Sequence, residues 1–417
     1  MRFQSNYSYR RERRMIALLG AIMLCAGCGS VVSGTPQPGT SAVDVSALRT
    51  GPFQTEPAAF ELKEGLDEPR QVRLVEGRRL INYLVNPVDI DPELRIPGKP
   101  AVFADEYGVP TLQGLHESHR AVLADNYKFI AGAAANQRNG SVRTPREMTL
   151  AVFHFDSATE SRRAARELHL ISAGLGAGTN IQVRETADAF VTETDGTRRD
   201  TWFAHGPYAI LVSARIPTPS LEELSRLSDG AINAQKRSLD AHKQVPLDEV
   251  LDVPVDGENI LRRAMDHDAR DSVPYEGYGT EYSDTYGTYR PAGIRHFERN
   301  PAEAAAVFER AGVDLIGRRA STVYRTRDTA AAFLLQTYLA SKGKDDTALD
   351  PPLGIADAQC VRFDSTDGRD HNSMCAVVYG RYVAVVTAKS IGFANFDGDL
   401  QERAAAQYII LQKCGLE

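Results

Sequence analysis

The sequence predicts an α+β fold of two tandem, duplicated units, each an antiparallel sheet with helices on one face. Four short features of the first unit recur in the same order 172 to 174 residues later, and a fixed offset of this kind indicates an internal repeat. The elements of each unit follow in the order β-α-β-β-β-α, which is typical of an α+β sheet. The recurring features are Asp156 and Asp328, Asp195-Gly196 and Asp367-Gly368, Gly206-Pro207-Tyr208 and Gly380-Arg381-Tyr382, and Ala234-Gln235 and Ala406-Gln407.

The first unit begins with a strand-like run at residues 150–153 and continues into a helix. Residues 157–160 have capping-box spacing, in which a hydroxyl and a carboxylate satisfy free N–H groups at a helix start. Two strands then pair across Asp195-Gly196, because both residues tolerate the positive φ of a tight hairpin. The next strand, residues 208–214, is almost continuously apolar and is therefore expected to be central, and a helix over 221–241 closes the unit.

The second unit repeats this order from a strand at residues 322–324 and a helix that begins after Asp328. A hairpin across Asp367-Gly368 leads into an apolar strand over 382–388 and a closing helix over 399–413. Prolines and acidic residues make the stretch between the units linker-like. We therefore expect an N-terminal domain at 58–245 and a C-terminal domain at 255–417, with additional helices near 73–85, 115–136, 257–266 and 301–312.

The N-terminus has the pattern of an export signal. Arginines at 10, 11, 13 and 14 precede the apolar run 15–24, which is too short to span a bilayer, and small residues lead to Cys28. Ala26-Gly27-Cys28 resembles a bacterial lipobox, although Cys25 stands where the family usually has Leu or Val. We expect a lipoprotein signal peptide at 1–27, lipidation at Cys28 and a flexible tether at 28–57; the alternative is a secretory signal with an incidental cysteine. The general secretion route is preferred to the twin-arginine route.

The net charge of the chain indicates which kinds of binding partner to expect. The chain of 417 residues carries 48 Lys and Arg against 55 Asp and Glu, a net charge of −7. Loss of residues 1–27 removes five Arg and one Glu and takes the net charge to about −11. An acidic surface repels phosphate backbones, so no nucleic-acid partner is expected.

Three cysteines remain after the signal and the lipidation site: Cys360, Cys375 and Cys414. If Asp367-Gly368 forms a two-residue turn, residues 360 and 375 lie directly across the hairpin, within reach of a disulfide. Counting outward from the turn places the two cysteines at a hydrogen-bonded pair, which is the less favourable of the two kinds of facing pair for a disulfide. The sequence therefore predicts a Cys360–Cys375 disulfide and a spare Cys414, while bridges that use Cys414 stay open.

Cys28, the Val-Ser-Gly-Thr-Pro tether and the two-part α/β body together resemble a family of uncharacterised actinobacterial envelope lipoproteins, the DUF7373-like lipoproteins. The resemblance in the body covers roughly residues 45–417, through 51–57, Gly77-Arg78-Arg79 and the apolar strands that begin with Tyr. It implies a cell-membrane lipoprotein with N- and C-terminal domains, anchored on the extracytoplasmic side. It implies no established activity and no catalytic residues.

No motif identifies a reaction, a metal or a cofactor. His116-Glu117-Ser118-His119 spaces its histidines three apart, whereas zinc proteases need four, so a surface helix is the better interpretation. The polar clusters 266–268 and 367–371 are interpreted as solvated surface. His154 is expected to be a half-buried or exposed sheet residue opposite Phe153 and Phe155, with an acid–base role as the alternative. Trp202 is expected in the core.

A Gly- and Tyr-rich segment lies between residues 271 and 291. Tyrosines offer rigid amphipathic area to sugars or proteins, so the segment is a candidate contact loop; the alternative is irregular surface. The favoured function is non-enzymatic binding of a lipid, glycan or envelope protein by a membrane-anchored lipoprotein. A cell-envelope hydrolase or transferase with an unrecognised site is the alternative. The candidate contact residues are Tyr275, Tyr278, Tyr282, Tyr286 and Tyr289.

Overall fold

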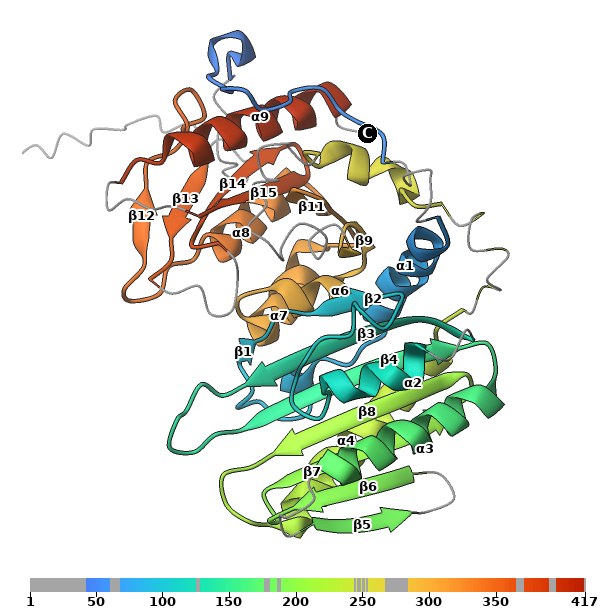
Figure 1. The fold of residues 1–417 in the computed structure, drawn as a ribbon. Helices are drawn as coiled ribbons and strands as arrows, with labels where there is room; N and C mark the ends of the chain where they lie inside the picture. The colour runs from blue at the N-terminus through green and yellow to red at the C-terminus, as the bar shows by residue number, and fades with distance from the viewer. Residues whose placement is uncertain are drawn as a thin grey trace, which may run out of the picture. The chain divides into compact units, whose positions relative to one another are not determined.

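The structure is a computed structural model, and it contains two antiparallel sheets with helices (Figure 1). Residues 38–417 form a single unit. The described residues are 43–60, 68–124, 128–175, 181–185, 189–243, 254–266, 284–364, 371–389 and 395–415, together with 245, 249 and 252. Among them, no helix is long and apolar enough to cross a membrane.

The first sheet has eight strands in the order β1-β3-β4-β8-β7-β6-β5, with β2 also paired to β3. Strands β4 and β8 lie at its centre and are buried along almost their whole length. The strands are β1 (Ile96–Pro97), β2 (Ala101–Phe103), β3 (Phe129–Arg138), β4 (Glu147–Phe155), β5 (Ile181–Glu185), β6 (Ala189–Thr194), β7 (Arg198–His205) and β8 (Tyr208–Arg215).

The second sheet has seven strands in the order β12-β13-β14-β15-β11-β10-β9. Its central strands β14 and β15 correspond to β7 and β8 of the first sheet. The strands are β9 (Gly287–Tyr289), β10 (Leu315–Arg318), β11 (Ser321–Arg325), β12 (Thr347–Leu349), β13 (Gln359–Arg362), β14 (Ser373–Tyr379) and β15 (Tyr382–Ala388).

The two sheets have the same topology, which confirms the predicted duplication. The path β3-β4-β8-β7-β6-β5 of the first sheet corresponds strand for strand to β10-β11-β15-β14-β13-β12 of the second. The registers also correspond, because Tyr208 opposes His154 in the first sheet and Tyr382 opposes Arg325 in the second. Each half thus builds one sheet by the same order of elements.

A buried glutamine repeats the same backbone clamp in each half. Gln235 accepts a hydrogen bond from the N–H of Val85 (2.9 Å) and donates one to the carbonyl of Tyr83 (2.9 Å). Gln407 accepts from the N–H of Met265 (2.9 Å) and donates to the carbonyl of Arg263 (2.8 Å). In both cases the amide brackets backbone groups two residues apart, in the segment that precedes its sheet. The predicted Ala-Gln repeat is therefore a repeated structural device.

Helices cover both faces of each sheet, so the expected placement on one face is wrong. In the first sheet, α4 packs with Val152 and Ile210, whereas α3 packs with Phe153 and Leu211 on the opposite face. In the second sheet, α8 and α9 likewise belong to different clusters. The physical reason is that the central strands are apolar on both faces, and an apolar face must be covered. The helices are α1 (Glu68–Ile81), α2 (Arg120–Ala124), α3 (Ala158–Leu175), α4 (Leu221–Asp240), α6 (Pro291–Ile294), α7 (Pro301–Ala311), α8 (Thr329–Leu339) and α9 (Gly398–Cys414).

The helix expected over 115–136 is only partly present. Among the described residues of this range, a short 3-10 turn and α2 are helical, and β3 begins at Phe129. The Ala-rich sequence of β3 favours a helix locally, but its neighbours decide otherwise. A Cβ on Gly132 would lie 2.2 Å from the ring of Phe103, so this strand needs a glycine where it meets β2. The helix expected over 257–266 is similarly reduced to two 3-10 turns, at 257–259 and 261–263.

The described end of the expected tether lies on the folded body. Phe53 is buried with Met265, Ala406 and Ile410, and the guanidinium carbon of Arg403 lies 4.7 Å from its ring centroid. An aromatic side chain buried against a helix gains both hydrophobic and cation–π stabilisation. Residues 43–60, which overlap the C-terminal part of the expected tether, thus pack against the C-terminal half of the chain.

The two halves of the chain share a hydrophobic core. Leu74 of α1 and Val152 of β4 belong to the same buried cluster as Tyr289 of β9 and Phe308 of α7. Polar contacts add to this cluster, since Arg295 bonds both oxygens of Asp89 (3.0 and 2.8 Å). Helix α1 contacts β3 of one sheet and β9 of the other, so it links the halves.

Candidate functional site

An open cavity of about 760 Å³, here called the Arg70 cavity, lies beside α1. This volume falls within the usual range of small-molecule sites. Its wall comes from α1, from residues 99–112 around β2, from α2 and from the residues that precede β9. The cavity therefore draws on segments more than 200 residues apart in the sequence.

Arg70 joins these segments through a network of ion pairs. Its Nε donates to Oδ2 of Asp105 (2.8 Å), and its two Nη atoms donate to the two oxygens of Asp284 (3.0 and 2.6 Å). Oδ1 of Asp105 accepts from the N–H of Gly108 (2.9 Å), which closes a turn. A Cβ at position 108 would lie 2.8 Å from Cβ of Phe103, so the turn needs glycine there. The planar guanidinium thus fixes two carboxylates at the cavity wall.

The electrostatics of this network are those of a partly buried ion cluster. The hydrogen bonds that Arg70 donates to Asp284 raise the pKa of Arg70 above its ordinary value, so the guanidinium stays charged. Burial raises the pKa of Asp284, although Arg70 acts in the opposite direction. Removal of one partner from a buried pair typically costs about 3–5 kcal/mol, because the other charge is left unpaired. We expect Arg70 to hold the cavity wall in place.

The rest of the wall combines charge with an exposed aromatic ring. Tyr107 is 80% exposed, and Lys99 and Arg120 add two cations to the lining. Arg120 donates to the carbonyl of Val109 (3.0 Å), which ties α2 to the loop that carries Tyr107. The apolar part of the lining includes Pro100, Pro110, Val109 and Leu112.

The described part of the lining holds few of the residue types that acyl-transfer or metal sites use. No serine, cysteine or histidine is among the described residues that line the Arg70 cavity. Across the described part of the chain, no group of three or more His, Cys, Asp or Glu side chains is arranged to hold a metal ion. The cavity offers carboxylates, cations, threonine hydroxyls and a tyrosine, which are groups that bind and orient a ligand.

The Gly- and Tyr-rich segment ends at this cavity, but only part of it is described. Tyr275, Tyr278 and Tyr282 lie outside the described residues, and Asp284 is the first described residue of the segment. Tyr286 is half-buried. Tyr289 is fully buried in β9, where its hydroxyl donates to the carbonyl of Thr285 (2.6 Å). Tyr289 is therefore a core residue and not a contact residue, because its strand packs under α1.

The predicted disulfide is present. Cys360 and Cys375 are bonded, and they face each other directly in the pairing of β13 with β14. Their Cα atoms lie 4.1 Å apart, closer to the spacing of a non-hydrogen-bonded pair than to that of the hydrogen-bonded pair expected from the turn. Cys414 is a free thiol, as expected, and burial raises its pKa. Cys28 lies outside the described residues.

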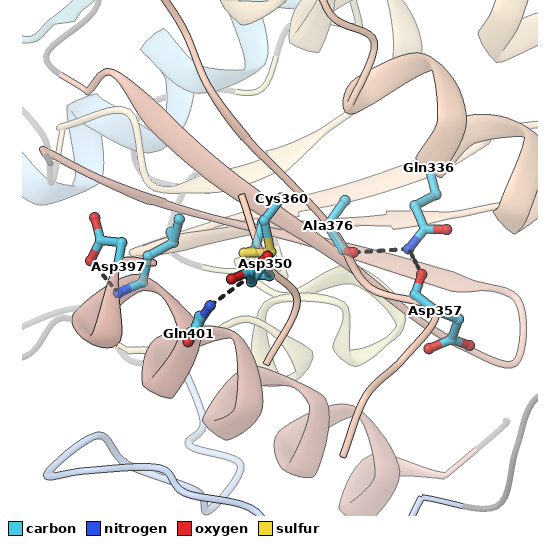
Figure 2. The surroundings of a disulfide bond; sticks show 9 residues. Gln336, Asp350, Asp357, Cys360, Ala376, Asp397 and Gln401 are labelled. Atoms are coloured by element: carbon cyan, nitrogen blue, oxygen red, sulfur yellow. Dashed lines mark hydrogen bonds between the residues drawn. A yellow bond between two sulfur atoms is a disulfide. The ribbon is translucent and has the colours of Figure 1, made fainter. Parts of the chain in front are cut away.

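Figure 2 shows what surrounds this disulfide. On one side, Gln336 of α8 donates to the carbonyls of Asp357 and Ala376 (both 2.9 Å). On the other, Gln401 of α9 donates to the carbonyl of Asp350 (2.7 Å), and Asp397 caps the helix by accepting from the N–H of Leu400 (3.1 Å). Side chains of α8 and α9 thus hold the backbone around the disulfide.

The histidines singled out in the sequence are structural. His119 is fully buried, and its Nε2 lies 3.0 Å from Oγ of Ser172, which also accepts from Nε1 of the buried Trp202 (3.1 Å). Burial lowers the pKa of His119 to about 4. The expected surface helix at 116–119 is a 3-10 turn over Glu117–His119 in which Glu117 and Ser118 are exposed and His119 is buried. The core position of Trp202 is confirmed. Of the two polar clusters singled out in the sequence, the one at 367–371 lies outside the described residues except for His371. In the cluster at 266–268 only Asp266 is described, and Asp266 pairs with Arg319 (2.5 Å).

His154 is buried in a second polar cluster, around Glu76, whose residues do not line the Arg70 cavity. Its Nδ1 lies 3.1 Å from Oε1 of the fully buried Glu76, and Nε2 of His242 lies 3.4 Å from the same oxygen. Arg79 pairs with the other oxygen of Glu76 (2.8 Å), and the Tyr208 hydroxyl lies 2.7 Å from Nδ1 of His242. The predicted orientation of His154, opposite Phe153 and Phe155, is confirmed, but its burial is deeper than expected because α1 covers it.

Sequence reasoning did not identify Arg70, Asp105 or Asp284. These residues are ordinary charges in sequence, and they meet only because the two halves fold together. Asp284 lies within the Tyr-rich segment between residues 271 and 291, and this segment was the one local signal near the site.

The fold and the cavity define a two-part α+β protein with a polar cavity. Two family models match the chain, described as the N-terminal domain of unknown function DUF7373, over residues 64–255, and its C-terminal counterpart, over residues 260–413. The chain therefore belongs to the DUF7373 family. No curated protein matches it. Among solved structures, the extracellular domain of PknH from Mycobacterium tuberculosis is similar, with 14% identity and a TM-score of 0.29, over 43% of this chain and 100% of that one.

Proposed function

We propose that this protein is an exported binding lipoprotein, anchored to the cell membrane through lipid on Cys28, whose Arg70 cavity holds a glycan-class ligand on the extracytoplasmic side. The N-terminal signal pattern and the lipobox-like Ala26-Gly27-Cys28 support export and anchoring. The Cys360–Cys375 disulfide supports an oxidising compartment. The resemblance to actinobacterial envelope lipoproteins points the same way.

The observation that carries the ligand class is the composition of the Arg70 cavity. Five charged side chains line it, namely Arg70, Lys99, Asp105, Arg120 and Asp284. Charged groups disfavour a buried acyl chain, because they would lose hydration without gaining hydrogen bonds. Sugars satisfy such groups with hydroxyls, and an exposed tyrosine such as Tyr107 offers a face on which a sugar ring can stack.

Binding is a better account than catalysis for the described lining. Acyl and glycosyl transfer need a positioned nucleophile or a free acid–base pair. The two carboxylates of the cavity are both engaged by Arg70, which holds them in ion pairs. No specific observation favours the envelope hydrolase or transferase, and the net charge of about −11 without the signal disfavours nucleic acid.

A glycan array probed with the exported chain tests this proposal. Tyr107→Ala should abolish or strongly weaken binding without loss of folding, since the side chain is exposed. Phe396→Ala is the matched control, because Phe396 is another exposed aromatic (62%) and does not line the cavity. Equal binding by the wild-type protein and Tyr107→Ala, or binding of phospholipid strips in preference to glycans, would contradict the proposal.

A further inference from the structure

A second cavity of about 370 Å³, here called the Asn86 cavity, lies between α4, the loop that follows α1, and α6. It is distinct from the Arg70 cavity, since the two share no lining residue. Its volume is at the lower end of the range of small-molecule sites. Its apolar wall includes Leu84, Ile90 and Ala234.

Asn86 lines this cavity and carries an unsatisfied donor. The N–H of Val88 donates to Oε1 of Gln137 (2.8 Å), which fixes the orientation of the Gln137 amide. Nε2 of Gln137 therefore donates to Oδ1 of Asn86 (2.6 Å). The other polar atom of the Asn86 amide is its nitrogen, Nδ2, which is a hydrogen-bond donor. Asn86 is 3% exposed, and its Nδ2 is buried without a hydrogen-bond partner among the described residues. A buried amide donor in this state is costly unless something accepts from it.

The charges at the Asn86 cavity favour an anion. Arg295 lines the cavity but is already bonded to both oxygens of Asp89 and to the carbonyl of Pro301 (2.9 Å). Arg237 of α4 also lines the cavity and is exposed, and it makes no ion pair or hydrogen bond with any described residue. Two cations and one anion thus leave one positive charge in excess, carried by Arg237.

We infer that the Asn86 cavity is a second binding site, for a small organic anion. The oxyanion accepts from Nδ2 of Asn86 and pairs with Arg237, and the apolar part of the ligand packs against Leu84, Ile90 and Ala234. Charge-assisted hydrogen bonds of this kind are about twice as strong as neutral ones. Gly230 leaves room on the helix side, because a Cβ there would have only Ile90 within 4 Å, at 3.8 Å.

The test uses benzoate, benzyl alcohol and inorganic phosphate as probes of the full exported chain. Saturation-transfer NMR follows the two organic probes, and ³¹P line broadening follows phosphate. We expect saturable benzoate binding, no comparable binding of benzyl alcohol, and a loss of about tenfold or more in Arg237→Gln and Asn86→Asp. Asn86→Asp keeps the oxygen that accepts from Gln137 but replaces the free donor with negative charge.

Arg226→Gln is the matched control, because Arg226 is an exposed arginine of the same helix that does not line the cavity. It should bind benzoate like the wild-type protein. Saturable binding of phosphate without benzoate would overturn the organic class of the ligand. No saturable binding, or benzoate binding that survives both Arg237→Gln and Asn86→Asp, would overturn the proposed site. A buried water would then be the hydrogen-bond acceptor for Nδ2 of Asn86.

Discussion

Mild acid should destabilise this protein through three buried histidines. Burial lowers the pKa of His119, His242 and His296 from 6.5 to about 4. The unfolded chain binds protons at these sites below pH 6.5, whereas the folded chain does so only near pH 4. The stability that these neutral histidines contribute is therefore fully present above pH 6.5 and is lost as the pH falls towards 4.

The size of the effect follows from the two pKa values. At pH 5, each histidine lowers the free energy of unfolding by about 2 kcal/mol relative to pH 7.5, because one pKa unit corresponds to about 1.4 kcal/mol. The three together give about 6 kcal/mol, which is a large part of the roughly 5–15 kcal/mol that stabilises a typical domain. The three side chains are at most 6% exposed, so solvent screening is small.

Urea unfolding at pH 8.5, 7.5 and 5 measures this loss. We expect no change between pH 8.5 and 7.5 from these groups, and a drop of about 6 kcal/mol at pH 5. His296→Gln should keep the hydrogen bond to the carbonyl of Leu84, which Nε2 of His296 makes at 3.0 Å, but should not titrate. The free energy of unfolding of His296→Gln should therefore fall by about 4 kcal/mol between pH 7.5 and pH 5. Equal pH dependence in His296→Gln and the wild-type protein would refute the reasoning.

Three further predictions address anchoring, the disulfide and the repeat. Cys28→Ala should release the protein from membranes or leave its precursor uncleaved; unchanged membrane fractionation and mass would argue against lipidation. Replacement of Cys360 and Cys375 by Ser should lower the free energy of unfolding by about 3 kcal/mol, the value for a 15-residue loop, and non-reducing peptide maps of the native chain should contain no cross-link to another cysteine. Gln407→Ala should cost about 3 kcal/mol, because it removes the partners of the Arg263 carbonyl and of the buried Ser321 hydroxyl, while the exposed Gln412→Ala should cost less than about 0.5 kcal/mol; equal losses would show that the clamp is not stabilising.

The duplicated fold could be predicted because its signals are local and periodic. The Tyr-initiated strands and the Ala-Gln pairs keep their spacing, since each holds the same place in its sheet. The disulfide followed from hairpin register alone, because residue numbers across a turn have a constant sum. These inferences needed no knowledge of which elements pack together.

The remaining features depend on packing between distant segments. Helix α3 and helix α4 lie on opposite faces of their sheet because β4 and β8 are apolar on both faces. The sequence revealed that these strands are apolar, but it did not reveal that helices would cover both faces of the sheet. Strand β3 forms from an Ala-rich sequence because Gly132 admits the Phe103 ring. The Arg70 cavity forms only when Asp105 and Asp284 meet one guanidinium, and their spacing in the sequence gives no sign of it.

Hydrogen–deuterium exchange with an actinobacterial envelope extract tests the central claim, that the Arg70 cavity is a ligand site. The extract is divided into an aqueous fraction that contains glycans and an organic fraction that contains lipids. With the aqueous fraction, we expect protection in peptides that cover residues 99–120 and 284–290, and no such protection in Tyr107→Ala. Protection confined to other segments, or protection of these peptides by the lipid fraction alone, would contradict the account.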